Sequence, residues 1–171
     1  EINCKMWDGT VAPPQVGSVV KVRGLVQEYN GRQQLRIERI RAAQPEDHVD
    51  LRLLVPCAPE EPEVMYKEIA DTVARFERED LRKLVTEMLR MAGDKLMYFP
   101  AAQRLHHAER SGLLHHTTGM LRTAEHIIAA YPFLNGDLLR AGVILHDLSK
   151  IQEMNSDDMG NVNDYTRDGL L

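Results

Sequence analysis

The stretch Ala141-Gly142-Val143-Ile144-Leu145-His146-Asp147-Leu148-Ser149-Lys150 decides the fold, because an apolar run delivers an adjacent histidine and aspartate. An imidazole and a carboxylate at the end of a buried helix are costly to desolvate unless a partner compensates. A divalent metal is one such partner, since both groups are metal ligands. The other interpretation is a plain helix end, with His146 packed in the core and Asp147 capping the next turn of the chain.

Six of the seven histidines fall within residues 106–146. A helix is expected from a cap at Ser111 to about Ala130, and four histidines precede or open it: His106, His107, His115 and His116. The next helix is expected over 138–147 and ends on His146-Asp147. Two consecutive antiparallel helices would bring His116 opposite this pair. We therefore expect His116, His146 and Asp147 to meet in one metal site.

The second half of the chain has helical periodicity. Apolar residues recur every three or four positions over 65–76 and again over 81–89, which predicts two antiparallel helices with Gly93 ending the second. Beyond Lys150 the sequence turns polar, and its composition predicts a loop.

The first 44 residues instead predict β structure. Asn30-Gly31 indicates a hairpin turn between strands expected over 19–29 and 33–40. The alternation puts Val20, Val22 and Val26 on one face, with Gly24 at a bulge or corner. Together with a strand over 2–7, this pattern is typical of part of a small barrel such as an OB-fold. A proline-rich, acidic linker follows over 45–62.

Basic and aromatic side chains gather in this β region, although the whole chain has a formal charge of −5. We interpret them as a face that stacks bases and holds the backbone of single-stranded RNA or DNA; its candidate residues are Trp7, Lys21, Arg23, Tyr29, Arg32 and Arg36. The alternative is that lysine and arginine fill the solvated face of an amphipathic sheet.

Composition and the chain ends indicate the cellular compartment and the extent of the protein. Two distant cysteines, Cys4 and Cys57, indicate free thiols and a reducing compartment, so a cytoplasmic protein is expected. No apolar run is long enough to predict a membrane span. The absence of an initiator Met and the final two leucines lead us to expect the middle of a longer protein. A homo-oligomer is left open.

The two histidine-containing stretches, 106–116 and 141–150, resemble the HD phosphohydrolase superfamily. With the Lys5-Met6-Trp7-Asp8 strand and the hairpin over 29–35, the chain is similar to the YhaM-type 3′–5′ exoribonucleases, which couple an OB-fold to an HD domain. The resemblance implies an α+β chain in two parts: a partial OB-like β-barrel (1–44), the linker (45–62) and an all-α HD-type domain (63–171).

By position, the resemblance implies that His116, His146 and Asp147 are metal ligands and that Asp147 also serves catalysis. Lys150 would hold a substrate phosphate or a bound water. His107 would act beside it, lining a phosphate pocket with His106. Mn²⁺ is the implied cofactor, and Mg²⁺, Co²⁺, Fe²⁺ or Ni²⁺ would also fit.

The resemblance also implies a later aspartate that closes the metal shell. No histidine follows His146, and the aspartates over 157–168 lie at the wrong distance. We therefore expect the next ligand beyond Leu171, and only part of a site within this chain.

The function predicted from the sequence is metal-dependent 3′–5′ exonucleolytic hydrolysis of single-stranded RNA, with DNA as a further substrate. Two alternatives stay open at this point. The first is an HD hydrolase of small nucleotides, and the second is a non-catalytic nucleic-acid-binding module.

Overall fold

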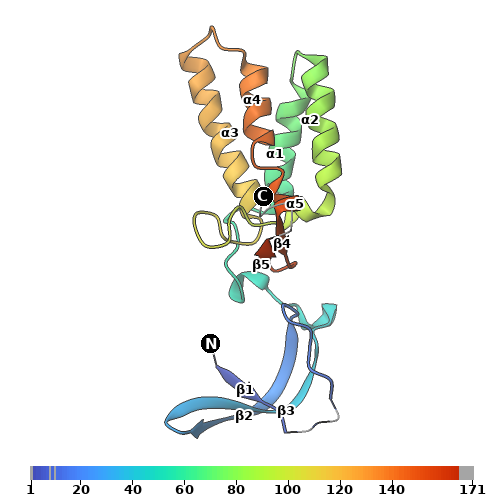
Figure 1. The fold of residues 1–171 in the computed structure, drawn as a ribbon, viewed down its shortest axis with the longest axis vertical. Coiled ribbons are helices and arrows are strands. Elements are labelled where there is room, and N and C mark those ends of the chain that lie inside the picture. The colour runs from blue at the N-terminus through green and yellow to red at the C-terminus, as the bar shows by residue number, and fades with distance from the viewer. Residues whose placement is uncertain (1, 8, 10, 166–171) are drawn as a thin grey trace. The chain divides into compact units, whose positions relative to one another are not determined.

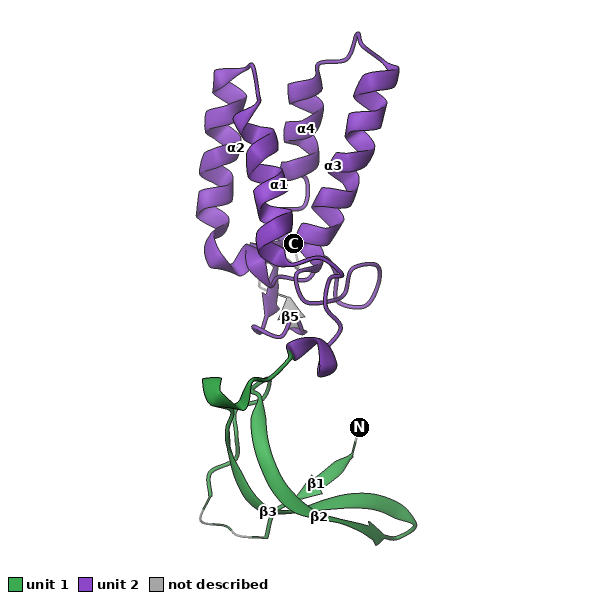
Figure 2. Ribbon diagram, turned by 180° about the vertical axis from the view of Figure 1, so that it is seen from behind, with its two compact units in different colours: residues 1–50 green, residues 51–171 purple. Residues whose placement is uncertain are grey.

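A computed structural model describes residues 2–7, 9 and 11–165, with the backbone alone over 163–165. The chain divides into two compact units, residues 1–50 and 51–171 (Figure 2). The first unit is built on a sheet and the second on helices, so the α+β class predicted from the sequence is confirmed. No helix in the described part of the chain is long and apolar enough to cross a membrane.

The first unit is an open three-stranded sheet with the strand order β1-β3-β2 (Figure 1). Its strands are β1 (Asn3–Lys5), β2 (Val20–Tyr29) and β3 (Arg32–Ala42). β2 and β3 are antiparallel, and β1 runs parallel to β3. Asn30 and Gly31 both have positive φ, 52° and 72°, and form the predicted turn. Asp8 lies outside the described residues, and over 2–7, 9 and 11–50 no further strand closes the sheet into a barrel.

A bulge at the predicted glycine keeps the two faces of this sheet distinct. Arg23 pairs with Arg39 and Gly24 pairs with Ile37, so Glu38 is the extra residue. A Cβ on Gly24 would lie 2.2 Å from the Arg36 carbonyl oxygen, so this close approach requires glycine. The register gathers apolar residues on one face, namely Val20, Val22, Val26, Leu35, Ile37 and Ile40. The other face carries Lys21, Arg23, Tyr29, Arg32, Arg36, Arg39 and Arg41.

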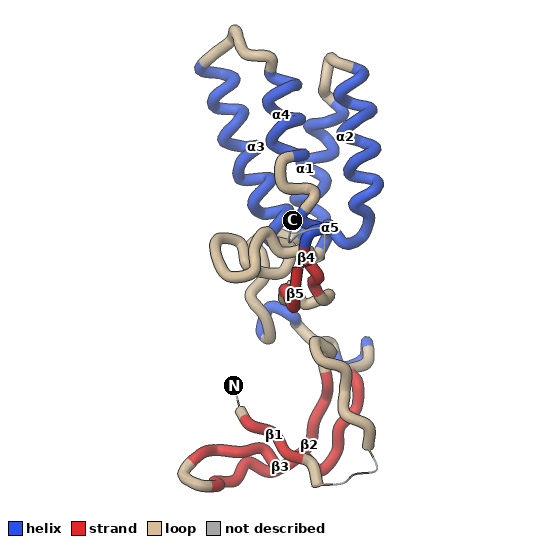
Figure 3. The backbone as a smooth tube through the Cα atoms, viewed as in Figure 1, coloured by secondary structure: helices blue, strands red, loops and turns tan. Residues whose placement is uncertain are grey.

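The second unit is a bundle whose four long helices lie side by side (Figure 3). They are α1 (Pro62–Ala74), α2 (Glu79–Ala92), α3 (Gly112–Ala130) and α4 (Gly136–Leu145). Short elements complete the unit: 3₁₀ turns Leu51–Leu53 and Gly93–Met97, α5 (Lys150–Glu153), β4 (Met154–Ser156) and β5 (Val162–Tyr165). A further 3₁₀ turn, Pro45–Asp47, belongs to the first unit.

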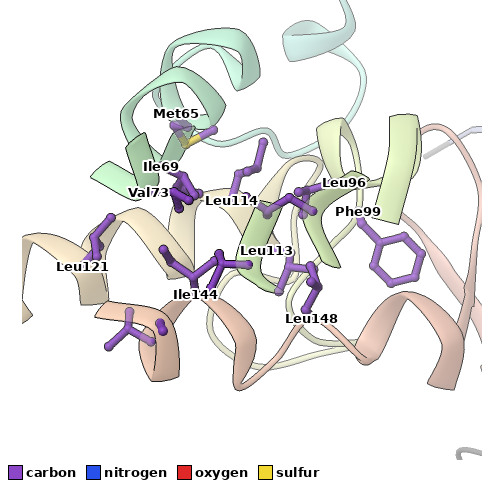
Figure 4. Packing of buried hydrophobic residues seen from close by; sticks show 14 of the residues in the cluster. Met65, Ile69, Val73, Leu96, Phe99, Leu113, Leu114, Leu121, Ile144 and Leu148 are labelled. Atoms are coloured by element: carbon purple, nitrogen blue, oxygen red, sulfur yellow. The ribbon is translucent and has the colours of Figure 1, made fainter. Parts of the chain in front are cut away.

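The core of the bundle takes side chains from each of the four helices and from the segment between α2 and α3. Its largest fully buried side chains include Met65, Ile69, Phe99, Leu113, Leu114 and Leu121 (Figure 4). Ile144 of α4 and Leu148 just after it complete the same cluster. Because the cluster joins α1, α3 and α4, it fixes the ends of α3 and α4 from which the candidate site is built.

Two predictions about helix ends are wrong. α4 ends at Leu145, and His146 is its C-terminal cap, so Asp147 lies in a turn and not on the helix. Ser111 precedes α3 with φ 63°, but its hydroxyl donates to the Met97 carbonyl oxygen (2.6 Å) and does not cap the helix. The serine thereby anchors the start of α3 to the preceding 3₁₀ turn.

The predicted loop after Lys150 is also wrong, because β4 and β5 form an antiparallel hairpin there. The Asp157 carboxylate organises the connecting turn by accepting from the backbone N–H groups of Met159 and Asn161. Gly160 completes the turn with φ 83°. Such aspartate turns are encoded by local hydrogen bonds and carry no periodic signal.

Gly112 allows the segment 98–111 to pack against the start of α3. A Cβ at this position would lie 2.0 Å from the His107 carbonyl oxygen and 3.2 Å from the Ala101 nitrogen. That carbonyl accepts from Ala101 N–H (3.0 Å), which closes the loop between them. The backbone that carries His107 therefore rests directly on a position that admits no side chain.

We predict that Gly112→Ala destabilises the chain by about 1–3 kcal/mol or more, because the added methyl forces the backbone of the loop to move. The matched control is Gly119→Ala on the same helix, where nothing lies within 4 Å of an added Cβ. That control should stabilise by up to about 1 kcal/mol through helix propensity. Urea unfolding measures both changes, and equal effects of the two substitutions would contradict the prediction.

Candidate metal centre

Three predicted ligands meet where the start of α3 faces the end of α4. His116 Nε2 lies 3.2 Å from His146 Nε2 and 3.4 Å from Asp147 Oδ2. His146 Nε2 is also 3.4 Å from the same carboxylate oxygen. The structure thus brings together the three side chains that the sequence predicted to converge.

The donor atoms of these residues fit a divalent metal. Ligands about 2.1 Å from one ion, at angles of roughly 100–109°, are about 3.2–3.4 Å apart. The Nδ1 atom of His146 lies 2.7 Å from the Val143 carbonyl oxygen. A hydrogen bond there places the proton on Nδ1 and leaves the Nε2 lone pair for a metal. Two imidazoles and one carboxylate suit a transition metal, although their role as ligands stays a prediction.

The electrostatics of the group favour the forms that bind metal. Burial lowers the pKa of His116 against the raising influence of Asp147, with smaller lowering effects from neighbouring histidines. Burial acts to raise the pKa of Asp147, but the hydrogen bond and charge of Lys150 outweigh it and the pKa is lowered. A neutral imidazole and an ionised carboxylate are the ligand forms that a divalent metal requires.

Lys150 is held in place by two hydrogen bonds. Its Nζ donates to Asp147 Oδ2 (2.8 Å) and to the Ala101 carbonyl oxygen (2.8 Å). An ammonium group has three hydrogens, so these contacts leave one for a further acceptor. Lys150 therefore orients the carboxylate and joins the segment 98–111 to the centre.

The two histidines predicted to line a phosphate pocket lie beside this centre. The ring centroids of His106 and His107 are 5.4 and 5.5 Å from that of His116. His106 is exposed, whereas His107 is half-buried and has φ 57°. Both are thus within reach of a group bound at His116.

Sequence reasoning missed a second group of possible ligands, formed by His107, Glu109 and His115. We assigned no role to Glu109 or His115. A carboxylate inside the histidine-rich segment 106–116 was the available signal. Its meaning depends on the loop fold, which the sequence pattern does not encode.

The predicted nucleic-acid residues lie in the sheet unit. Trp7 and Tyr29 are 73% and 58% exposed, and Arg32 and Arg36 share the face of Tyr29. Lys21 is already paired, because its Nζ donates to the Asp47 carboxylate (2.7 Å). The pKa of Asp47 is lowered by hydrogen bonds from Arg41 and, to a smaller extent, from Lys21.

Arg23 is also partly neutralised, since its Nε lies 3.8 Å from Glu38. Arg32, Arg36 and Arg39 form no ion pair with any residue that the structure describes. Among the described residues of the three strands, the basic side chains without an ion pair to another described residue are therefore Lys5, Arg32, Arg36 and Arg39.

The chain is similar to bacterial proteins named 3′–5′ exoribonuclease YhaM. That of Oceanobacillus iheyensis is 34% identical over 160 residues, which cover 90% of this chain and 50% of the relative. That of Listeria innocua is 37% identical over 157 residues, with the same shares of 90% and 50%. That of a Geobacillus species is 34% identical over 174 residues, covering all of this chain and 53% of the relative.

These similarities confirm the predicted relationship to the YhaM-type exoribonucleases. The chain spans about half the length of the curated relatives that it matches. No family model matches the chain, and no solved structure matches it significantly.

We predict that Lys150→Met costs about 1.5–3 kcal/mol of stability at pH 7, the range for a hydrogen bond to a charged group. The folded-state pKa of Asp147 lies below its usual value, so its stabilising contribution is present above about pH 4 and is lost as the pH falls through the folded value. The difference between wild type and variant should therefore shrink below about pH 4.

Urea unfolding from pH 7 to below about pH 4, in the presence of a metal chelator, measures the effect of Lys150→Met. Lys67→Met is the control, because Lys67 makes an exposed ion pair with Asp71 that contributes little. A pH-independent loss in Lys150→Met would show that its bond to Ala101, and not the one to Asp147, is what matters.

Proposed function

We propose that this chain, a relative of the YhaM-type exoribonucleases, carries part of the active site of a metal-dependent 3′–5′ exoribonuclease acting on single-stranded RNA. One observation supports this most: His116, His146 and Asp147 converge in a chain similar to such enzymes over 90–100% of its length. The helical unit would be the HD-type domain, and Mn²⁺ the preferred metal.

The proposed chemistry is phosphodiester hydrolysis at the centre formed by these three residues. His116, His146 and Asp147 would hold a divalent ion, which when bound polarises a phosphate and lowers the pKa of an attacking water. Lys150 offers its remaining hydrogen to a phosphate oxygen and keeps Asp147 ionised. His106 and His107 stand at the same end of α3, where they can contact a phosphate held near His116.

The sheet unit would hold the RNA strand as an OB-like surface does. Tyr29 offers an exposed ring for base stacking, and Arg32 and Arg36 on the same face offer charge to the backbone. Lys5 lies with its Nζ 5.9 Å from the Tyr29 ring centroid and adds to this face. Such contacts favour single strands with little sequence preference, and DNA would bind by the same means.

We predict that His146→Ala and Asp147→Asn each reduce the rate of RNA hydrolysis by at least about 100-fold, since loss of a direct ligand exceeds the roughly 10–100-fold effect of an outer-shell partner. The assay follows shortening of a 5′-labelled single-stranded oligoribonucleotide, with Mn²⁺, by the intact protein that carries this sequence. His126→Ala is the control, because His126 is exposed on α3 and belongs to neither ligand group.

Two outcomes would overturn the proposal. Hydrolysis confined to free nucleotides would indicate a small-nucleotide hydrolase. Unchanged RNA hydrolysis in His146→Ala would mean that the helices are structural and that this chain is a non-catalytic nucleic-acid-binding module.

We predict that the double substitution Arg32→Gln, Arg36→Gln weakens binding to single-stranded RNA and flattens its salt dependence. Two lost phosphate contacts should reduce the slope of log K against log salt by about 1.4, at about 0.7 per contact. Fluorescence anisotropy over a range of salt concentrations measures this slope.

The control for charge alone is Lys67→Gln, Lys83→Gln, which removes two exposed positive charges from α1 and α2. Equal weakening by both double variants would mean that the sheet arginines merely fill a solvated face.

A further inference from the structure

We propose that His107, Glu109 and His115 form a second site for a divalent transition metal such as Zn²⁺, separate from the centre at His116, His146 and Asp147. Their ligand atoms all lie within 4.8 Å of one another. The proposal does not rest on the proposed function, because its three ligands are not those of the first centre; His107 alone also appears in the proposed function, as a phosphate contact.

The three ligand atoms form a tight triangle. His115 Nδ1 lies 2.7 Å from Glu109 Oε1 and 3.0 Å from His107 Nδ1. His107 Nδ1 lies 3.5 Å from the same carboxylate oxygen. All three atoms can therefore lie about 2.1 Å from one ion, at ligand–metal–ligand angles of roughly 80–113°.

Hydrogen bonding alone serves this triangle poorly. A neutral ring nitrogen either carries one hydrogen or offers one lone pair. If His115 Nδ1 donates to Glu109, it has no lone pair for a hydrogen from His107. If His115 Nδ1 accepts from His107 instead, it has no hydrogen to donate to the carboxylate oxygen that lies 2.7 Å away. A cation between the three atoms satisfies all of their lone pairs at once.

The backbone holds these residues firmly. His115 lies in the first turn of α3, and its N–H donates to the Ser111 carbonyl oxygen (3.1 Å). The His107 carbonyl accepts from Ala101 and packs over Gly112. The residue after Glu109 is fixed on both sides, because Arg110 N–H donates to Pro56 and its carbonyl accepts from Ala58. The triangle is therefore preorganised by the fold.

The chemistry of the ligands indicates the class of metal. Two imidazoles and one glutamate are a set used by zinc enzymes, in which a fourth position stays open. The three side chains are 28%, 21% and 29% exposed, so an ion can enter and yet be shielded. The ring of His107 lies 5.5 Å from that of His116, so an ion bound by His107 would also hold this ring in place beside the first centre.

The test measures Co²⁺ binding to the chain carrying His146→Ala and Asp147→Asn, which removes the first centre. We expect one Co²⁺ per chain, with a visible absorption band that Zn²⁺ abolishes by competition. Adding Glu109→Gln or His115→Phe should weaken binding by more than about 100-fold, beyond the loss typical of an outer-shell partner. RNA hydrolysis plays no part in this readout, so the two proposals fail independently.

The matched control is His126→Phe, an exposed ring on the same helix, which should leave Co²⁺ binding unchanged. Circular dichroism checks that each variant folds. If His115→Phe does not fold, Glu109→Gln decides the outcome because it preserves size and shape. Absence of Co²⁺ binding in the background chain, or equal binding in Glu109→Gln, would overturn the proposal.

Discussion

The antiparallel packing of α3 on α4 is the interaction on which the rest of the helical unit depends. Leu121 on α3 and Ile144 on α4 are buried in one cluster, and Arg140 pairs with Glu125 across the two helices. Burial of such apolar surface is the main favourable contribution to folding. Because the pair is antiparallel, the first turns of α3 meet the last turn of α4, where the histidines stand. The apolar positions therefore determine where the candidate ligands His116 and His146 meet.

This dependence explains which parts of the site were predictable. Helical periodicity and a short connection fix the relative positions of His116 and His146 from sequence alone. The pairing of Lys150 with Ala101 and the triangle at Glu109 were not predictable, since both depend on the path of an irregular segment. Ser111 shows the same limit: its position before α3 follows from the sequence, but its hydroxyl bonds to Met97 instead of capping the helix.

In the sheet unit too, the strands could be predicted from the sequence pattern, whereas the ion pairs could not. Period-two alternation and the Asn-Gly turn predict both strands, and the bulge at Gly24 preserves the two faces. Counting charges, however, overstates the basic surface. Asp47 is 26 residues from Lys21 in sequence and yet holds both Lys21 and Arg41. Only the folded chain shows which arginines remain available to an anionic ligand.

The two hydrogen bonds that join Arg110 to Pro56 and Ala58 have a mechanical consequence. The segment that arrives from residue 51 is clamped here, one residue from Glu109, before it reaches α1. A force applied along residues 51–58 is thus transmitted first to the backbone beside the candidate ligand Glu109, and only afterwards to α1 and the rest of the helical bundle.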